Sequence, residues 1–256
     1  MTTPMTTAQP HRLLGVWAHP DDEAYLSAGL MAEVVDRGGA VTVVAVTDGE
    51  LGFPADDDRL TEVKAKQRRS ELLDALAALG VHDVRFLGHP DGRLAELRGQ
   101  DLAAELVPIM RSVRPTMTVT FGPDGITGHD DHIAAGQAAT AAWMETRMGG
   151  LWYAAKSSLW LDEWRATNDA IGIWMGDEPD GVRTDAIELA LTLDGPALDQ
   201  KRAALAAHGS QTDRLASMLG EPTYRRWIAE ETFRRPTDVE LADVDAALAM
   251  ANWCHR

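Results

Sequence analysis

Seven residues near the start of the chain, Trp17-Ala18-His19-Pro20-Asp21-Asp22-Glu23, bring together groups that bind metals or move protons. His19 and Asp22 are separated by two residues, so one helical turn or a tight bend can aim both at one ion. Pro20 stiffens this turn because its ring fixes φ. Asp21 then points elsewhere and stays free to act as a base beside the ion.

A run of carboxylates at the end of a strand also has a simpler interpretation, because acidic residues favour the positive end of a helix and often only cap it. A second cluster, His129-Asp130-Asp131-His132, favours the chemical interpretation. Histidine nitrogen and carboxylate oxygen are the ligands of a catalytic zinc, which needs three protein groups and an open position for water. A His-x-x-Asp at one strand end and a His-x-x-His at another therefore predict a metal site.

The elements that must position these residues alternate between strand and helix. Residues 13–16 form an apolar run typical of a buried strand, and residues 24–37 carry apolar side chains at helical spacing. Three further strands are expected at 40–46, 84–87 and 116–121, with helices at 61–79, 101–113 and 133–146. This order predicts a parallel sheet with right-handed crossovers and helices on both faces.

Polar residues follow three of these strands where each strand ends. They are His19, Asp21 and Asp22 after the first strand, Asp48 and Glu50 after the second, and His129, Asp131 and His132 after the fourth. The carboxyl ends of parallel strands meet at one edge of the sheet, where open α/β sheets bind their ligands. We therefore expect the three groups to lie together.

The second half of the chain is less regular. Strand candidates are 151–161, 171–175 and 186–193, the first two bearing tryptophans, and helices are expected at 197–207, 224–233 and 241–250. No fixed-period repeat, low-complexity tract or clear linker is present. We expect one Rossmann-like α/β domain over residues 1–256, with a mostly parallel sheet flanked by helices and residues 1–10 as a frayed tail.

Composition narrows the class of protein. The 256 residues are 45% hydrophobic and 25% charged, as in soluble globular proteins, and no stretch approaches the roughly 18 to 20 apolar residues of a membrane span. A net charge of −16 without a basic stripe argues against nucleic-acid binding. Cys254 is the only cysteine, and residues 1–10 lack an apolar signal core, so we expect a cytoplasmic protein. Homo-oligomerisation stays open.

Three motifs carry a resemblance to a known family: Ala18-His19-Pro20-Asp21-Asp22-Glu23, Thr47-Asp48-Gly49-Glu50 and Gly128-His129-Asp130-Asp131-His132. Residues 86–92 and 201–211 support it. The chain resembles the LmbE-like, or PIG-L, zinc-dependent N-acetylglucosaminyl deacetylases, which include enzymes of the mycothiol and bacillithiol pathways. The resemblance covers most of residues 14–140 and a C-terminal patch.

The resemblance implies roles for individual residues. Three residues would bind Zn²⁺, or another divalent ion such as Fe²⁺: His19, Asp22 and His132. Asp21 would be the general base and His129 the second protein group of the mechanism. Asp131 would orient His129 from behind.

Three further residues are weaker candidates for binding the substrate. Arg68 stands three residues before Glu71 on a helix, a spacing typical of a surface ion pair. Asp91 lies in a Pro-Asp-Gly turn, where aspartate is common, although carboxylates also hold sugar hydroxyls. His208 fits either the C-terminus of a helix or the wall of a pocket.

One position departs from the family pattern. Some sugar deacetylases of the family carry a tyrosine two residues before the first histidine of the second motif, and here Thr127 stands at that position. What replaces the tyrosine, and what the tryptophan-rich stretch 151–175 does, stay open.

We therefore expect a metal-dependent amide hydrolase that uses a metal-activated water to remove an acyl group, in the first place acetyl, from an N-acylated amino sugar or its glycoside. One alternative substrate is a thiol conjugate or an acylated natural product. A second alternative is a binding protein without turnover. The first strand lacks Gly-x-Gly-x-x-Gly, which argues against nucleotide binding, and the intact set of base and ligands argues against an inactive relative.

Overall fold

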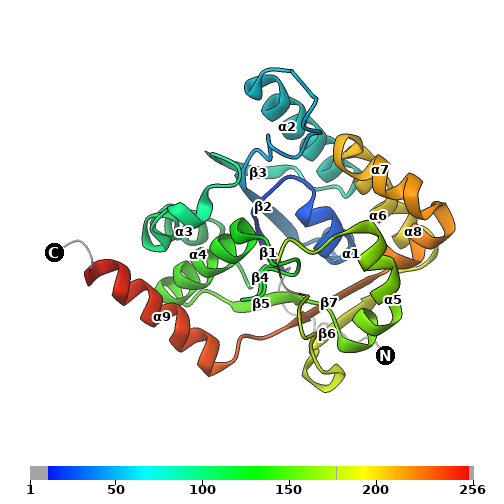
Figure 1. The fold of residues 1–256 in the computed structure, drawn as a ribbon. Coiled ribbons are helices and arrows are strands. Elements are labelled where there is room, and N and C mark those ends of the chain that lie inside the picture. The colour runs from blue at the N-terminus through cyan, green and yellow to red at the C-terminus, as the bar shows by residue number, and fades with distance from the viewer. Residues whose placement is uncertain (1–10, 177, 254–256) are drawn as a thin grey trace.

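A seven-stranded sheet in the order β3-β2-β1-β4-β5-β7-β6 forms the centre of the computed structural model, which describes residues 11–176 and 178–253 (Figure 1). Five strands are parallel: β1 (Arg12–Trp17), β2 (Ala40–Thr47), β3 (Asp83–His89), β4 (Met117–Phe121) and β5 (Gly150–Ala155). Beyond β5 the sheet continues with β7 (Glu230–Arg234), which is antiparallel to both of its neighbours, and with β6 (Leu189–Thr192) at the edge. The predicted mostly parallel α/β sheet is confirmed.

Both faces of the central strands are covered by helices. Every residue of β1 from Leu13 and of β2 from Val41 is buried, which explains why these strands are continuous apolar runs rather than alternating patterns. In Figure 1, α1 (Asp22–Asp36), α2 (Thr61–Ala78), α6 (Gly195–Ala207), α7 (Gly209–Leu219) and α8 (Glu221–Ile228) lie on one side of the sheet. On the other side lie α3 (Gly99–Val113), α4 (Asp130–Thr146) and α9 (Asp238–Trp253).

The strand order reverses direction at β1. The chain runs outward from β1 through β2 to β3, and then returns through α3 to place β4 against the opposite side of β1. Such a switch point leaves a crevice at the carboxyl ends of the two strands between the diverging connections. The loops that carry His19 and His129 follow β1 and β4, so the topology delivers both predicted clusters to this crevice.

The second half differs from the sequence prediction in three places. The predicted helix 224–233 is instead α8, which ends at Ile228, and the strand β7, which begins at Glu230. The predicted strand 151–161 ends at Ala155, and Ser157 then caps α5 (Ser158–Ile171) by accepting a hydrogen bond from Trp160 N. Short apolar segments do not distinguish helix from strand by periodicity alone, which explains both errors.

The predicted strand 171–175 is also wrong, because this segment is a loop. Gly172 ends α5 with a φ of 63°, and Met175 N then donates to Thr127 O at 2.7 Å. The loop therefore lies against the segment that precedes α4. Gly128 permits this approach, since a Cβ there would stand 2.8 Å from Gly176 N.

The remaining expectations divide into two groups. Helices α6 and α9 and strand β6 lie where the sequence predicted them, each with slightly different bounds. The expected frayed tail at 1–10 and Cys254 lie outside the described residues. Among the helices that the structure describes, none is long and apolar enough to cross a membrane.

Candidate metal centre and active site

The loop between β1 and α1 places three acidic side chains around a strained turn. Asp21 has a φ of 124°, which is costly for a residue with a Cβ. Its N–H donates to Glu23 Oε2 at 3.0 Å, and its carbonyl accepts the N–H groups of Ala24 and Tyr25 at the start of α1. Asp22 points the other way and accepts the His19 N–H at 2.8 Å. The turn thus separates the directions of Asp21 and Asp22.

His19, Asp22 and His132 bring two ring nitrogens and one carboxylate together. His19 Nδ1 lies 3.2 Å from His132 Nε2 and 3.7 Å from Asp22 Oδ2. His132 Nε2 lies 3.3 Å from Asp22 Oδ1. One potential ligand atom from each residue lies within 4.8 Å of the others, and all three side chains are largely buried. Two histidines and one carboxylate are a donor set of catalytic zinc, so these residues fit a divalent ion.

The second nitrogen of each histidine ring has its own acceptor. His132 Nδ1 lies 2.9 Å from the carbonyl oxygen of Gly125. His19 Nε2 lies 3.0 Å from Asp91 Oδ1 and 3.4 Å from Asp131 Oδ2. If His132 Nδ1 and His19 Nε2 carry the hydrogens and donate to these acceptors, the other two nitrogens have free lone pairs. These nitrogens, His19 Nδ1 and His132 Nε2, face each other and Asp22. Metal-binding histidines in proteins are usually oriented in this way.

Asp131 acts on a different histidine from the one predicted. Its carboxylate is fully buried and accepts the N–H groups of Gly92 at 2.7 Å and Leu94 at 2.9 Å, besides facing His19. Its contact with His129 is made through the backbone, where Asp131 N donates to His129 Nδ1 at 3.0 Å. The carboxylate therefore orients His19 rather than His129.

Asp91 likewise contacts protein rather than an open surface. It is 7% exposed, accepts the Leu51 N–H at 2.8 Å and faces His19 Nε2. Glu50, from the loop after β2, in turn accepts the Asp91 N–H at 3.0 Å. Asp91 therefore supports His19 and also borders a cavity, and its contact with a substrate stays a prediction.

His129 is the N-cap of α4 and faces the candidate ligands. Its ring stacks on that of His132 with centroids 4.9 Å apart, and the His19 ring is 4.8 Å away. Burial and the positive charges of His19 and His132 lower the pKa of His129. Since the side chain is only half-buried and borders the cavity, a ligand can reach it.

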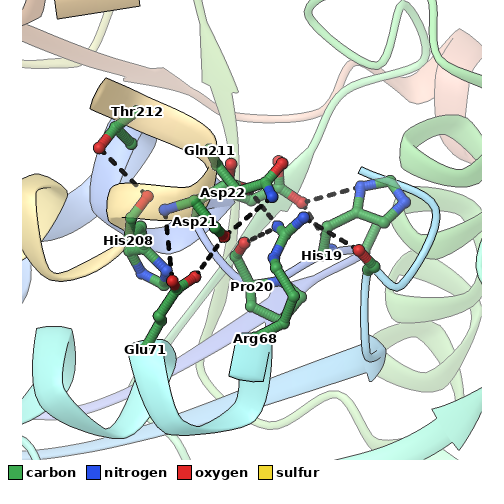
Figure 2. Close-up of polar contacts among 12 residues, drawn as sticks. His19, Pro20, Asp21, Asp22, Arg68, Glu71, His208, Gln211 and Thr212 are labelled. Carbon is green, nitrogen blue, oxygen red and sulfur yellow. Dashed lines mark hydrogen bonds and ion pairs between the residues drawn. The ribbon is translucent and has the colours of Figure 1, made fainter. Parts of the chain in front are cut away.

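Arg68 holds the strained turn from below. Its guanidinium is 2% exposed and donates to the carbonyls of Gly49, at 3.0 Å, and Pro20. It also lies 3.4 Å from Asp21 Oδ1, and Figure 2 shows it among Asp21, Asp22 and His19. The alternative of a surface ion pair with Glu71 does not hold, because Glu71 accepts hydrogen bonds from Ser210. Arg68 borders the polar cavity, and its contact with a substrate stays a prediction.

His208 does not line a pocket, contrary to the prediction. It is fully buried, and its Nε2 lies 2.7 Å from Glu23 Oε1, at the end of the cluster opposite His19 (Figure 2). Glu23 therefore connects His208 to the backbone of Asp21. Sequence reasoning assigned no role to Glu23, although its place directly after Asp22 in the first motif was a usable signal.

Burial and charge together set the protonation of the cluster. Burial raises the pKa of Asp21 to about 6, against the opposing charge of Arg68, and raises that of Asp22 to about 6. Burial opposes a charge on His19, but the carboxylates of Asp131, Asp91 and Asp22 raise its pKa to about 10. Burial and the charge of His19 lower the pKa of His132 to about 4. A bound cation would act against the protonated form of His19.

Two cavities meet at these residues. One, of about 340 Å³, is bordered by polar groups that include His19, Asp21, Asp91 and His129. The other, of about 270 Å³, is bordered mainly by apolar side chains. Both include Asp22 and His132 in their walls, together with Tyr25, Thr127, Ile173 and Gln211. Gln211 is the last residue of the stretch 201–211, which supports the family resemblance.

Thr127 occupies the position at which some sugar deacetylases of the PIG-L family carry a tyrosine. Its hydroxyl lies 3.3 Å from His132 Nδ1, on the side of the ring that also faces Gly125 O. The tryptophan-rich stretch that follows β5 supplies Trp160, Ile173 and Trp174 to the wall of the apolar cavity. Part of the stretch 151–175 and its surroundings thus forms one wall of a cavity that also includes Asp22 and His132.

Comparison with known proteins gives three findings. Residues 14–143 match the family described as PIG-L, GlcNAc-PI de-N-acetylase. The chain is 30% identical over 250 residues to a 1D-myo-inositol 2-acetamido-2-deoxy-alpha-D-glucopyranoside deacetylase of Kineococcus radiotolerans, covering 79% of this chain and 69% of the relative. It is 31% identical over 239 residues to the deacetylase of the same name from Mycobacterium sp. (strain JLS), covering 82% and 77%.

A solved structure shares the fold. The N,N'-diacetylchitobiose deacetylase from Pyrococcus horikoshii aligns with a TM-score of 0.64, covering 87% of this chain and 82% of that one. The two sequences are 22% identical, so this likeness speaks to the fold alone.

Proposed function

The chain belongs to the PIG-L family, and on that premise we propose that it removes an acyl group, in the first place acetyl, from an N-acylated amino sugar or its glycoside. The names of the similar deacetylases of Kineococcus and Mycobacterium describe such a glycoside. The observation that carries the proposal is the approach of His19, Asp22 and His132 at the mouth of a polar cavity, with Asp21 beside them.

Zn²⁺ is the proposed ion, with Fe²⁺ as the alternative, and His19, Asp22 and His132 would hold it. The donor set supports this choice, since imidazole and carboxylate together suit both ions. When bound, such an ion polarises the amide carbonyl and lowers the pKa of a water molecule towards 7. Asp91 and Asp131 are positioning residues, because both face the His19 nitrogen that turns away from the other two ligands.

Asp21 is the proposed general base, which takes a proton from the attacking water. Its side chain is 19% exposed and borders the polar cavity, so a water molecule there can reach it. The pKa of about 6 that burial gives it is close to neutral, as efficient proton transfer requires. Glu23 and Arg68 fix its position, one through the backbone and one through the carboxylate.

His129 is the proposed partner on the other side of the cavity. Because its Nδ1 accepts the Asp131 N–H, His129 would donate the N–H of Nε2 to the developing negative charge on the carbonyl oxygen. The proton that Asp21 takes from the water would then pass to the departing amine. Its place beside His132, partly open to the cavity, supports this role.

The domain and the location are part of the same proposal. A single deacetylase domain extends over residues 1–256, since strands from both halves share one sheet. We place it in the cytoplasm on the strength of its single cysteine. Its partner is a small molecule, not a nucleic acid.

Release of a free amine tests the proposal. Metal-loaded protein is incubated with N-acetylglucosaminyl glycosides, including the 1D-myo-inositol glycoside and N,N'-diacetylchitobiose, and amine and acetate are measured together. We expect equimolar release by the wild type and little by Asp21→Asn with equal metal content. No release from any N-acyl amino sugar by fully metallated wild-type protein would exclude the function and favour a binding protein.

A further inference from the structure

The apolar cavity beside the candidate metal centre has an unusually aromatic wall. Four aromatic side chains border it: Tyr25, Trp160, Trp174 and Trp227. Trp227 packs against Tyr25 at 6.0 Å between ring centroids and an interplanar angle of 79°, and against Trp160 at 5.9 Å and 48°. At about 270 Å³, the cavity exceeds the roughly 150 Å³ apolar cavity that holds a benzene ring.

Away from Asp22 and His132, the wall carries an ammonium group, that of Lys156. Lys156 Nζ stands 4.5 Å from the centroid of the Trp160 ring and donates to Glu230 O at 3.3 Å. No carboxylate of the described residues lies within 4.0 Å of this ammonium group. The indole N–H groups of Trp160 and Trp174 are buried and have no acceptor among those same residues. Ammonium and N–H groups both favour the face of an aromatic ring.

The cavity opens where the reacting carbonyl must lie. Its wall includes Asp22 and His132, two of the three candidate ligands. In an N-acyl amino sugar the acyl group is bonded directly to the carbonyl carbon, whereas the aglycone is several bonds away. The polar cavity, with Asp91 and His129 in its wall, suits the hydroxyl-bearing sugar. The methyl of an acetyl group would leave most of the apolar cavity unfilled.

We propose that the apolar cavity binds the acyl group of the substrate and that, beyond acetyl, it accepts and prefers an aromatic acyl group of about the size of phenylacetyl. The inference rests on the proposed function, because it assigns the acyl side of the same reaction. Lys156 would face the ring, and the tryptophans would pack against its edge and face.

Four glycosides test the assignment. Methyl glucosaminides carrying N-acetyl, N-cyclohexylacetyl or N-phenylacetyl are compared with the phenyl glycoside of N-acetylglucosamine, which moves the ring to the aglycone. We expect kcat/KM for N-phenylacetyl to exceed that for N-acetyl by about tenfold or more. It should exceed that for N-cyclohexylacetyl by about two- to tenfold, because only the phenyl ring has a face that accepts donors.

Substitutions in the wall of the cavity sharpen the test. Leu215 borders the cavity, so Leu215→Trp should fill it and abolish the preference for N-phenylacetyl over N-acetyl. Met218 lies on the same helix but is 52% exposed, so Met218→Trp should retain the preference. Lys156→Met keeps the bulk of the side chain and removes the cation. It should reduce the preference for phenyl over cyclohexyl about twofold or more.

Binding separates this inference from the proposed function. Calorimetric titration of Asp21→Asn with the same glycosides should give a Kd for N-phenylacetyl at least about tenfold below that for N-acetyl. Turnover of N-acetyl without any preference for N-phenylacetyl would overturn the aromatic acyl site and leave deacetylation standing. A preference for the phenyl aglycone, or equal binding of all four, would also overturn it. Absence of turnover with tight N-phenylacetyl binding would reject the activity and retain the site.

Discussion

The two nitrogens of His19 have different neighbours: one faces the other candidate metal ligands, and one faces the carboxylates that orient the ring. Nδ1 faces His132 and Asp22, and Nε2 faces the carboxylates of Asp91 and Asp131. A neutral imidazole donates from one nitrogen and accepts at the other, so the carboxylates select the tautomer that leaves Nδ1 free. Two aspartates distant in sequence thus set the orientation of a candidate ligand, and through it they would act on a bound ion.

Measurement of bound metal should distinguish His19, a proposed ligand, from Asp21, the proposed base. We expect about one divalent ion per chain in the wild type and little in His19→Ala, because that change removes one of three ligands. Asp21→Asn should bind a normal amount, since Asp21 is outside the trio, yet lose turnover. Elemental analysis of matched samples decides, and equal loss of metal in both variants would refute the division of roles.

His129 offers a second test at a single residue. His129→Ala should lower turnover by about 10² or more, the usual cost of a lost oxyanion donor, with metal content near that of the wild type. His129 also caps α4, so a merely structural role would lower stability and leave kcat almost unchanged. His129→Asn, which retains a capping side chain, is the control. Near-normal kcat in a fully metallated alanine variant would exclude the catalytic role.

The sequence predicted some of these residues and missed the partners of others. His19, Asp22 and His132 follow strand ends at recognisable spacings, and the fold brings them together. The partners of Asp131 and His208 depend on how loops distant in sequence pack against β1, which no local pattern records. A buried histidine and a pocket histidine look alike in sequence, because both occur near helix ends.

At the scale of elements, α1 connects the site to the rest of the molecule. Its first residue is Asp22, and its middle N–H groups, at Gly29 and Leu30, donate to the carboxylate of Glu231 on β7. Lys201 on α6 donates to the same carboxylate at 2.8 Å, and both side chains are fully buried. An ion pair in the interior thus joins α1, α6 and β7.

Breaking this pair should be costly. Lys201→Met leaves the charge of Glu231 buried without its cation, so we expect a loss of about 3 to 5 kcal/mol in the free energy of unfolding. Arg183→Ala is the matched control, because the Arg183–Asp185 pair is 83% and 68% exposed and its removal should change stability by about 0.5 kcal/mol or less. Denaturant unfolding of both variants measures the difference, and similar midpoints would contradict the expectation.

The pair of His208 and Glu23 joins the α6–α7 junction to α1 and should make stability depend on pH. Burial opposes a charge on His208, but Glu23 raises its pKa above the ordinary 6.5. A raised pKa in the folded state means that the stabilisation is complete below about pH 6.5 and is lost as the pH rises through the folded value. The free energy of unfolding should therefore fall more steeply between pH 6 and 9 in the wild type than in His208→Gln. Parallel curves would exclude this linkage.

Element types were predicted best where the pattern was long. The four strand–helix pairs of the first half have several helical turns of regular spacing, and all are present. The errors fall in 151–175 and 224–233, where helix and strand follow each other within a few residues. There Ser157 and the pairing of β7 with β5 and β6 decide the structure, and sequence spacing does not reveal either.

At the scale of the whole molecule, the sheet and the site both connect distant parts of the chain. β6 and β7, from the last third, complete the sheet that β1 to β5 begin. The candidate ligands come from the loop after β1, the start of α1 and the start of α4, and His132 is 113 residues from His19. Opening the crevice between β1 and β4 would separate His19 from His132, so the ion should stabilise the fold as a whole.

Unfolding with and without metal tests this coupling. We expect one cooperative transition, because strands from both halves of the chain share one sheet. An ion at about 100 times its Kd adds about 2.7 kcal/mol to the folded state, which corresponds to a rise in Tm of about 5 to 10 °C for a chain of this size. A chelator should remove that rise in the wild type and have little effect on His19→Ala. Calorimetry that finds two separate transitions would contradict the single domain, and a Tm insensitive to chelation in metallated protein would place the ion elsewhere.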